Sequence, residues 1–307
     1  MPLNAQARAF VDAFEALPAV DFSTISAADF RTAFAAPIAE ASGDEVERVE
    51  DRLIDTAAGP LRLRLYIPAG TGRLPVTLYF FGSGFVIGSL EWTDHICRAL
   101  ANRAGSLVVS VDYRLAPEAP FPAAVEDALS ALHWVHGHIA EWGGDAQRLA
   151  VAGDSSGGNL AAVLAQLARA EGIGLRHQLL LYPPLDAAAD TPSYRELATG
   201  YGFTAAWMLW YWRQYLPDAR SAQDVRASPL RQTDLRGLPS ATIFTAECDI
   251  LRDEAEAYAN ALQAAGVAVE LTRWPGQIHG FILMQGLLDD AELALNAAAA
   301  ALRRAFA

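Results

Sequence analysis

The sequence predicts an α/β protein in which helices cover both faces of a mostly parallel central sheet. From about residue 76 onward, short continuously apolar segments alternate with amphipathic helical segments. Strands that are buried on both faces produce such apolar runs, and the intervening helices supply the covering layers. The chain has 307 residues, of which 52% are hydrophobic, so it is long and apolar enough for one large core with a small accessory domain.

The predicted strands are short, and the first differs from the rest. In residues 61–67 three leucines alternate with two arginines and a tyrosine, which predicts a half-exposed antiparallel edge. The later strands lack this alternation and are predicted at 76–81, 107–112, 149–152, 178–182, 241–246 and 268–273. The main helices are predicted at 123–139, 158–170, 254–265 and 289–305.

Two segments break this rhythm and are predicted to form a cap at the carboxyl ends of the strands, where open α/β sheets bind ligands. Residues 4–17 and 27–36 have the spacing of amphipathic helices. Residues 207–215 are rich in tryptophan and tyrosine, and these rings either line a pocket or hold the cap to the body. The predicted division is 1–45 and 185–236 for the cap, and 46–184 and 237–307 for the α/β domain.

Composition excludes some partners. The net charge of −13 leaves no basic stripe for a nucleic acid, and an anionic membrane surface would repel the chain. We find no secretory signal in residues 1–10 and no apolar stretch of membrane-spanning length, so we predict a cytoplasmic protein. Cys97 and Cys248 match no metal-ligand spacing and are predicted to be reduced thiols rather than a disulfide.

Residues 153–157 read G-D-S-S-G between an apolar strand and a helix. In that context G-x-S-x-G predicts a sharp, strained turn that presents Ser155 as a nucleophile above the positive end of a helix dipole. Ser156 is the alternative nucleophile, but it occupies the position whose backbone N–H normally serves an oxyanion.

A serine hydroxyl needs a base, which is most often histidine. When the nucleophile lies on such a turn, an acid and then the histidine follow later in the chain, each after a strand. His279, which follows the last predicted strand, fits this order. The histidines that do not fit are His95, His133, His136, His138 and His177. Three of these share one predicted helix with no complete set of metal ligands, so we interpret them as part of a solvated face.

The acid should follow the strand at 241–246, where four carboxylates lie close together. Glu247 adjoins the strand, whereas Asp253 and Glu254 resemble first-turn residues of the next helix. Asp249 is therefore preferred, although periodicity alone does not select it.

Four blocks make the chain resemble the hormone-sensitive-lipase family of esterases, a branch of the α/β hydrolases. They are GDSSGGNL at 153–160, DYRLAPE at 112–118, DILRDE at 249–254 and IHGF at 278–281. The resemblance implies an α/β-hydrolase fold with a helical cap, and it implies Asp249 as the catalytic acid. The family usually has alanine where this chain has Ser156, and proline where it has Ile250.

The resemblance also implies an oxyanion hole formed by the backbone N–H groups of Ser83, Gly84 and Ser156. The family's His-Gly-Gly-Gly is replaced here by F-G-S-G at 81–84. A Cβ at Ser83 conflicts with a glycine-type φ, and Phe81 cannot make the hydrogen bonds of a histidine, so we expect a displaced loop. The alternative is that Ser83 keeps its N–H in place while Phe81 packs against apolar neighbours.

The expected activity is hydrolysis of short- to medium-chain acyl esters through an acyl-enzyme on Ser155, with His279 as base and Asp249 orienting it. The expected partner is a small-molecule ester, and no metal or organic cofactor is required. The alternatives are an amidase or deacetylase with the same triad, or a non-catalytic small-molecule binder, because some relatives are receptors. The sequence leaves both a monomer and a homodimer open.

Overall fold

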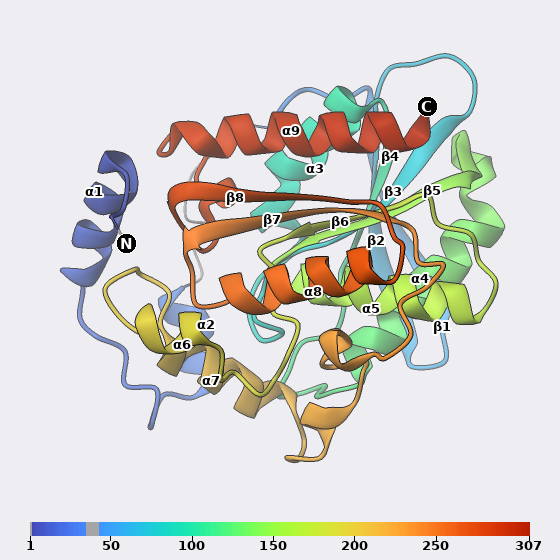
Figure 1. Ribbon diagram of the computed structural model, residues 1–307. Helices are drawn as coiled ribbons and strands as arrows, with labels where there is room; N and C mark the ends of the chain where they lie inside the picture. Colours follow the sequence, from blue (N-terminus) through green and yellow to red (C-terminus); the bar gives the residue numbers. More distant parts are fainter. Residues whose placement is uncertain (1, 35–42) are drawn as a thin grey trace.

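The computed structural model describes residues 2–34 and 43–307, and its centre is an eight-stranded sheet with the order β1-β2-β4-β3-β5-β6-β7-β8 (Figure 1). β2 runs antiparallel to β1 and β4, and all neighbours from β4 to β8 are parallel, as expected from the sequence. The prediction that residues 61–67 form the edge of the sheet is wrong, because β1 pairs with the outer side of β2. The strands are β1 (Arg48–Thr56), β2 (Gly59–Ile67), β3 (Leu74–Phe80), β4 (Leu107–Val111), β5 (Gly144–Asp154), β6 (His177–Leu181), β7 (Ser240–Cys248) and β8 (Val269–Ile278).

Helices cover both faces of this sheet. In Figure 1, α3 and α9 lie on one face, and α4, α5 and α8 lie on the other. The helices are α1 (Ala5–Glu15), α2 (Ala27–Ala33), α3 (Asp94–Ala104), α4 (Ala123–His138), α5 (Ser156–Ala170), α6 (Pro192–Glu196), α7 (Ala205–Tyr215), α8 (Arg252–Ala264) and α9 (Asp289–Phe306). The predicted helix at 27–36 ends earlier as α2, and its last two positions lie outside the described residues.

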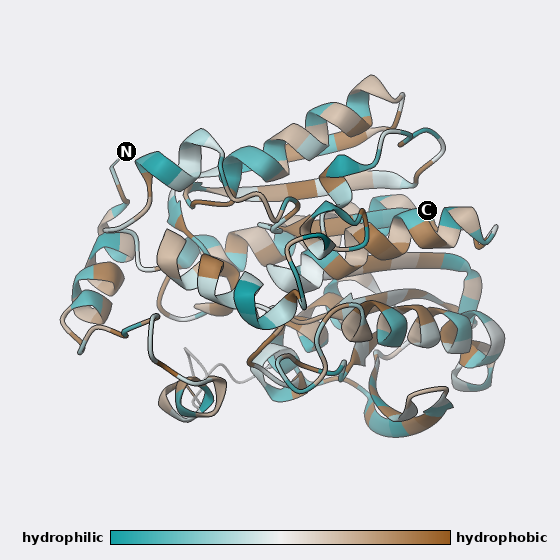
Figure 2. Cartoon of the chain, turned by 90° about the horizontal axis from the view of Figure 1, so that it is seen from below, coloured by the Kyte–Doolittle hydropathy of each residue, from teal (hydrophilic) through white to brown (hydrophobic). Residues whose placement is uncertain are grey.

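The central strands are buried, as expected for a sheet that helices cover on both faces. Every residue of β4 and β6 is buried, because helices pack on both sides of these strands. Figure 2 shows hydrophobic residues along the strands, and mixed hydrophobic and hydrophilic residues along the helices that cover them. None of the helices in the described part of the chain combines the length and the apolarity needed to cross a bilayer.

The sequence did not predict β1 or α3. β1 is the outer edge strand, where Leu53 is 74% exposed and Ile54 is the one buried residue. A strand without a buried face leaves no hydrophobic alternation in the sequence. α3 is only 11 residues long, and Ile96 and Leu100 are the only large aliphatic side chains among its buried residues, so its mean hydropathy is low.

The N-terminal helices and the 185–236 insertion lie together beside one end of the sheet (Figure 1). The ring of Phe30 on α2 packs 4.8 Å from Trp210 and 5.5 Å from Trp207 on α7, measured between centroids. Arg31 donates hydrogen bonds of 2.7 Å to the carbonyls of Val86 and Ala116, in loops that follow β3 and β4. These contacts place α2 at the carboxyl ends of the parallel strands.

Candidate active site

Ser155 lies on the turn between β5 and α5, in the strained conformation that the motif predicts. Its φ of 50° and ψ of −124° are unusual for a residue with a side chain. Two glycines make the tight turn possible: a Cβ at Gly153 would collide with the backbone of Gly157, and a Cβ at Gly157 would collide with the carbonyl of Phe80. Strand and helix therefore approach closely, and the serine side chain projects from the turn.

The structure brings Ser155, His279 and Asp249 into one hydrogen-bonded chain. Ser155 Oγ lies 2.9 Å from His279 Nε2, and His279 Nδ1 lies 2.8 Å from Asp249 Oδ2. Asp249 is 2% exposed, and its other oxygen accepts the Leu251 N–H at 3.0 Å. With Nδ1 protonated toward the carboxylate, Nε2 is free to accept the serine proton.

The three other acids that the sequence left open have different partners. Each accepts a backbone N–H at 2.7 or 2.8 Å, and none of these bonds involves His279. The donors are Gly276 for Glu247, Ser193 for Asp253 and Leu185 for Glu254. The geometry therefore selects Asp249 from the four candidates.

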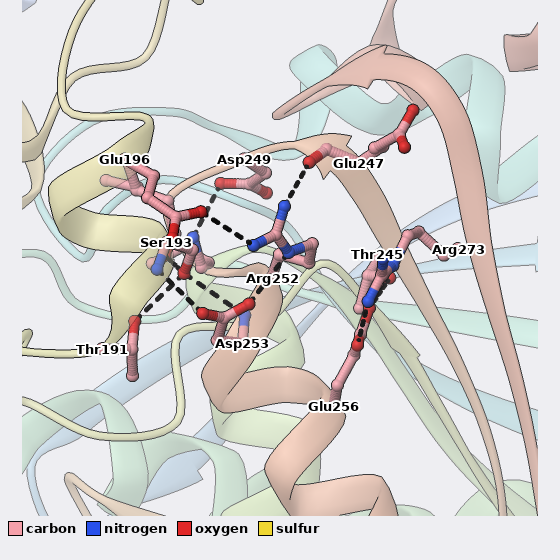
Figure 3. A network of polar contacts seen from close by, with 12 residues as sticks. Thr191, Ser193, Glu196, Thr245, Glu247, Asp249, Arg252, Asp253, Glu256 and Arg273 are labelled. Atoms are coloured by element: carbon pink, nitrogen blue, oxygen red, sulfur yellow. Dashed lines mark hydrogen bonds and ion pairs between the residues drawn. The ribbon is translucent and has the colours of Figure 1, made fainter. Parts of the chain in front are cut away.

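The loop that carries Asp249 is held against α6 of the insertion (Figure 3). Arg252 donates to the carbonyl of Glu247 at 3.0 Å and to Asp253 Oδ1 at 2.9 Å. The second oxygen of Asp253 accepts the N–H of Ser193 on α6 at 2.8 Å. These bonds on both sides fix the position of the Asp249 carboxylate.

Two aromatic side chains that sequence reasoning missed flank His279. The ring of Phe203 stacks on the imidazole with centroids 4.5 Å apart and an interplanar angle of 23°. Tyr182 meets the imidazole at 5.0 Å and 64°, nearly edge-on. The aromatic richness of the insertion was visible in the sequence, but nothing there indicated which ring reaches the histidine.

A cavity of about 380 Å³ opens in front of Ser155 and His279. Aromatic rings from α1, α2 and the insertion supply most of its apolar wall, among them Phe10, Phe14, Phe34, Phe203, Trp207 and Tyr211. Trp207 also packs against Phe30, so the aromatic run does both things that the sequence left open. It lines the pocket and it holds the insertion to α2.

The loop after β3 does not show the distortion that we expected. Phe81 is fully buried and stacks on Tyr113 with centroids 4.5 Å apart at 18°. Ser83 is not among the residues with positive φ, so its Cβ is compatible with the backbone. Gly84 takes the left-handed conformation instead, with φ of 54°, and a Cβ there would collide with the Tyr211 ring. The backbone conflict that we expected at Ser83 is therefore absent, and Phe81 packs against an apolar neighbour as in the alternative.

The three predicted oxyanion residues lie together, but one N–H already has an acceptor. Ser156 is the first residue of α5, and its side-chain Oγ accepts the backbone N–H of Ser83 at 2.9 Å. The loop is further tied to β5 because Asp154 Oδ1 accepts the Gly82 N–H at 2.8 Å. Asp154 is fully buried, and this burial raises the pKa of its carboxyl group.

The remaining histidines stay apart from this site. His133, His136 and His138 are exposed on α4, as predicted. His95 and His177 are buried in α3 and β6. Residues 2–34 and 43–307 contain no group of three or more histidine, cysteine or acidic side chains that could hold a metal ion. Cys97 and Cys248 are both buried free thiols, as predicted.

Comparison with known proteins gives consistent matches. Residues 77–283 match a family described as alpha/beta hydrolase fold. The carboxylesterase NlhH of Mycobacterium tuberculosis is 42% identical over 265 residues, covering 84% of this chain and 83% of that protein. The ethyl acetate hydrolase of Pseudomonas putida is 39% identical over 255 residues, covering 81% and 80%. The solved structure of an esterase from Pyrobaculum calidifontis matches with a TM-score of 0.90 and 39% identity over 99% of each chain.

Proposed function

The chain belongs to the hormone-sensitive-lipase-like esterases of the α/β-hydrolase fold and is a carboxylic-ester hydrolase, and on this basis we propose that it acts by acyl transfer to Ser155. The observation that carries the proposal is the hydrogen-bonded chain from Ser155 through His279 to Asp249. These three residues lie at the wall of an apolar cavity that is large enough for a small ester.

In the proposed mechanism, Ser155 Oγ attacks the ester carbonyl while His279 Nε2 takes its proton. The tetrahedral intermediate expels the alcohol, which receives that proton from His279. A water molecule then gives a proton to His279 and attacks the acyl-enzyme, releasing the acid and returning the proton to Ser155. Asp249 holds the imidazole in the required tautomer and stabilises its protonated form.

We place the developing oxyanion against backbone N–H groups of the loop at Ser83 and Gly84 and of Ser156. Gly84 and Ser156 are the principal donors, because the Ser83 N–H is given to Ser156 Oγ in the free protein. Ser156 also lies at the N-terminus of α5, where the helix dipole favours negative charge.

We propose short- to medium-chain acyl esters as substrates, because the cavity wall is mostly aromatic and aliphatic. The cap is proposed to consist of residues 1–45 and 185–236, whose described parts meet through the Phe30 and Trp207 rings. The net charge of −13 disfavours nucleic acids and anionic membranes as partners, and the two free thiols suit a reducing cytoplasm. A homodimer stays a hypothesis that size-exclusion chromatography with light scattering would test.

The decisive experiment combines Ser155→Ala with a series of p-nitrophenyl esters of increasing chain length and a matched anilide. We expect Ser155→Ala to lower kcat by at least about 10⁴-fold with the fold intact, and Ser156→Ala to keep measurable turnover. An aryl phosphonate should label the peptide that contains Ser155, as read by mass spectrometry. Activity that survives Ser155→Ala but not Ser156→Ala would overturn the proposal, and faster anilide than ester cleavage would indicate an amidase.

A further inference from the structure

We propose that the hydroxyls of Ser156, Ser83 and Tyr113 form a directed hydrogen-bond chain that positions the oxyanion loop. The inference rests on the proposed function, and it assigns these side chains as positioning residues rather than catalytic ones. Phe81 stands where the resembled family has a histidine, and its side chain offers the loop no hydrogen bond.

The three hydroxyls are buried and in contact. Ser83 Oγ lies 2.6 Å from the Tyr113 hydroxyl and 3.0 Å from Ser156 Oγ. The Tyr113 hydroxyl lies 2.6 Å from the carbonyl oxygen of Phe81. None of the three side chains is more than 4% exposed, so these bonds are largely shielded from bulk water.

Counting protons gives the chain one direction. A carbonyl oxygen only accepts, so the single proton of Tyr113 goes to Phe81. The Ser83 hydroxyl must then donate to the Tyr113 oxygen. In the contact between the two serines, the Ser156 hydroxyl therefore donates to Ser83 Oγ. Burial raises the pKa of Tyr113, so its hydroxyl keeps the proton on which this order depends.

The hydroxyls of Ser83 and Ser156 also accept backbone N–H groups, next to the two residues of the loop that have positive φ. Gly84 and Phe85 have successive φ values of 54° and 63°, and the second is costly for a residue with a side chain. Ser83 Oγ accepts the Phe85 N–H at 2.8 Å, and Ser156 Oγ accepts the Ser83 N–H at 2.9 Å. Both peptide neighbours of Gly84 are thereby anchored, which fixes the direction of the Gly84 N–H. An oxyanion donor acts only when it points at the position where charge develops.

The test compares Ser83→Ala, Tyr113→Phe and their double variant with the wild-type chain on one short-chain p-nitrophenyl ester. We expect Ser83→Ala to lower kcat by about 10- to 100-fold with KM changed by less than about twofold, because an oriented donor acts chiefly in the transition state. Tyr113→Phe keeps the stack on Phe81 and should lower kcat by about tenfold. The double variant should be no worse than Ser83→Ala, since the chain is already broken.

A second readout separates positioning from stability. The inhibition constant of an aryl trifluoromethyl ketone, whose adduct carries the oxyanion, should rise in parallel with the fall in kcat. Ser106→Ala is the matched control, because it breaks an equally buried hydroxyl pair with Thr77 at 3.1 Å, outside the site. It should lower the melting temperature and leave kcat unchanged.

Several outcomes would overturn the inference. They are a kcat for both single variants within about twofold of wild type, additive losses in the double variant, or ketone affinity that does not follow kcat. If Ser83→Ala does not fold, Tyr113→Phe alone decides, because it removes one oxygen and keeps the ring. Ser155→Ala is measured in parallel to distinguish two failures. An active Ser155→Ala variant refutes the proposed function. An inactive Ser155→Ala variant, together with wild-type kcat in the Ser83 and Tyr113 variants, refutes only the positioning role of the hydroxyls.

Discussion

The phenyl ring of Phe203 lies face to face with the imidazole of His279, 4.5 Å away between centroids. Phe203 belongs to the insertion between β6 and β7, two residues before α7, whereas His279 follows β8. The insertion therefore contacts the proposed base directly.

The first prediction concerns this stack. Phe203→Ala should lower kcat about tenfold, because the imidazole loses the surface that limits its rotation away from Ser155. Phe203→Tyr keeps the ring and is the matched control, which should stay within about twofold of wild type. Steady-state kinetics on one p-nitrophenyl ester measures both. Equal kcat values for the alanine variant and the wild type would show that the stack has no role in holding the base.

The second prediction concerns the acid. Asp249→Asn should lower kcat by about 10⁴-fold, because an amide at this position favours the wrong histidine tautomer. Glu247→Gln is the control, since it makes the same carboxylate-to-amide change while its Oε1 still accepts the Gly276 N–H. Glu247→Gln should keep wild-type kcat. The assignment of the acid fails if Asp249→Asn keeps kcat within about tenfold of wild type.

Some features of this site were readable from the sequence, and others depend on tertiary contacts. Ser155 was predicted because G-x-S-x-G, the strand before it and the helix after it are local. Asp249 was one of four carboxylates in eight residues, and resemblance rather than periodicity favoured it. The contact of Ser83 with Tyr113 joins residues 30 positions apart, and that of Phe203 with His279 joins residues 76 apart. No pattern in the sequence encodes which side chains meet across such distances.

The third prediction follows from the stack of Phe81 on Tyr113. Phe81→His should not raise kcat, because Asp154 and Ser156 already accept the N–H groups of Gly82 and Ser83, and the Phe81 ring fills a buried site on Tyr113. An imidazole there loses apolar burial, so we expect about 1–2 kcal/mol less stability. Urea unfolding and steady-state kinetics check the two effects. A clear rise in kcat would mean that the loop is impaired as it stands.

The fourth prediction separates two kinds of contact made by Arg31. Its guanidinium donates to the carbonyls of Val86 and Ala116, and it also forms an ion pair with Glu118. The hydrogen bond from Arg31 lowers the pKa of Glu118 to about 2, but the Glu118 side chain is 65% exposed, so solvent screens this pair. We expect Arg31→Ala to raise KM severalfold, because Phe30 and Phe34 of the cavity wall lose their tether.

Glu118→Gln is the matched control for Arg31, since it removes the charge and leaves both carbonyl bonds. It should change KM by less than about twofold and leave the melting temperature nearly unchanged. Equal effects of Arg31→Ala and Glu118→Gln would mean that the ion pair, rather than the carbonyl contacts, holds α2 in place.

The last prediction concerns His177, a buried histidine outside the active site. Its Nδ1 lies 2.8 Å from Ser240 Oγ and its Nε2 lies 3.1 Å from Thr242 Oγ1, in the interior beside β7. Burial, with a smaller contribution from Arg304, lowers the pKa of His177 to about 4 from an ordinary value of 6.5. The neutral ring therefore stabilises the fold fully above about pH 6.5. Between about 6.5 and 4 the unfolded chain binds a proton that the folded chain does not, so stability falls as the pH falls.

At 1.36 kcal/mol per pKa unit, this one group should remove about 2 kcal/mol of unfolding free energy between pH 7 and 4.5. Urea denaturation at both pH values measures the total loss, to which carboxylates also contribute. His177→Gln isolates the histidine, because glutamine still offers polar atoms to Ser240 and Thr242 but does not titrate. The variant should lose about 2 kcal/mol less than the wild type over this interval. Parallel losses in the two proteins would show that His177 is protonated at the same pH whether the chain is folded or unfolded.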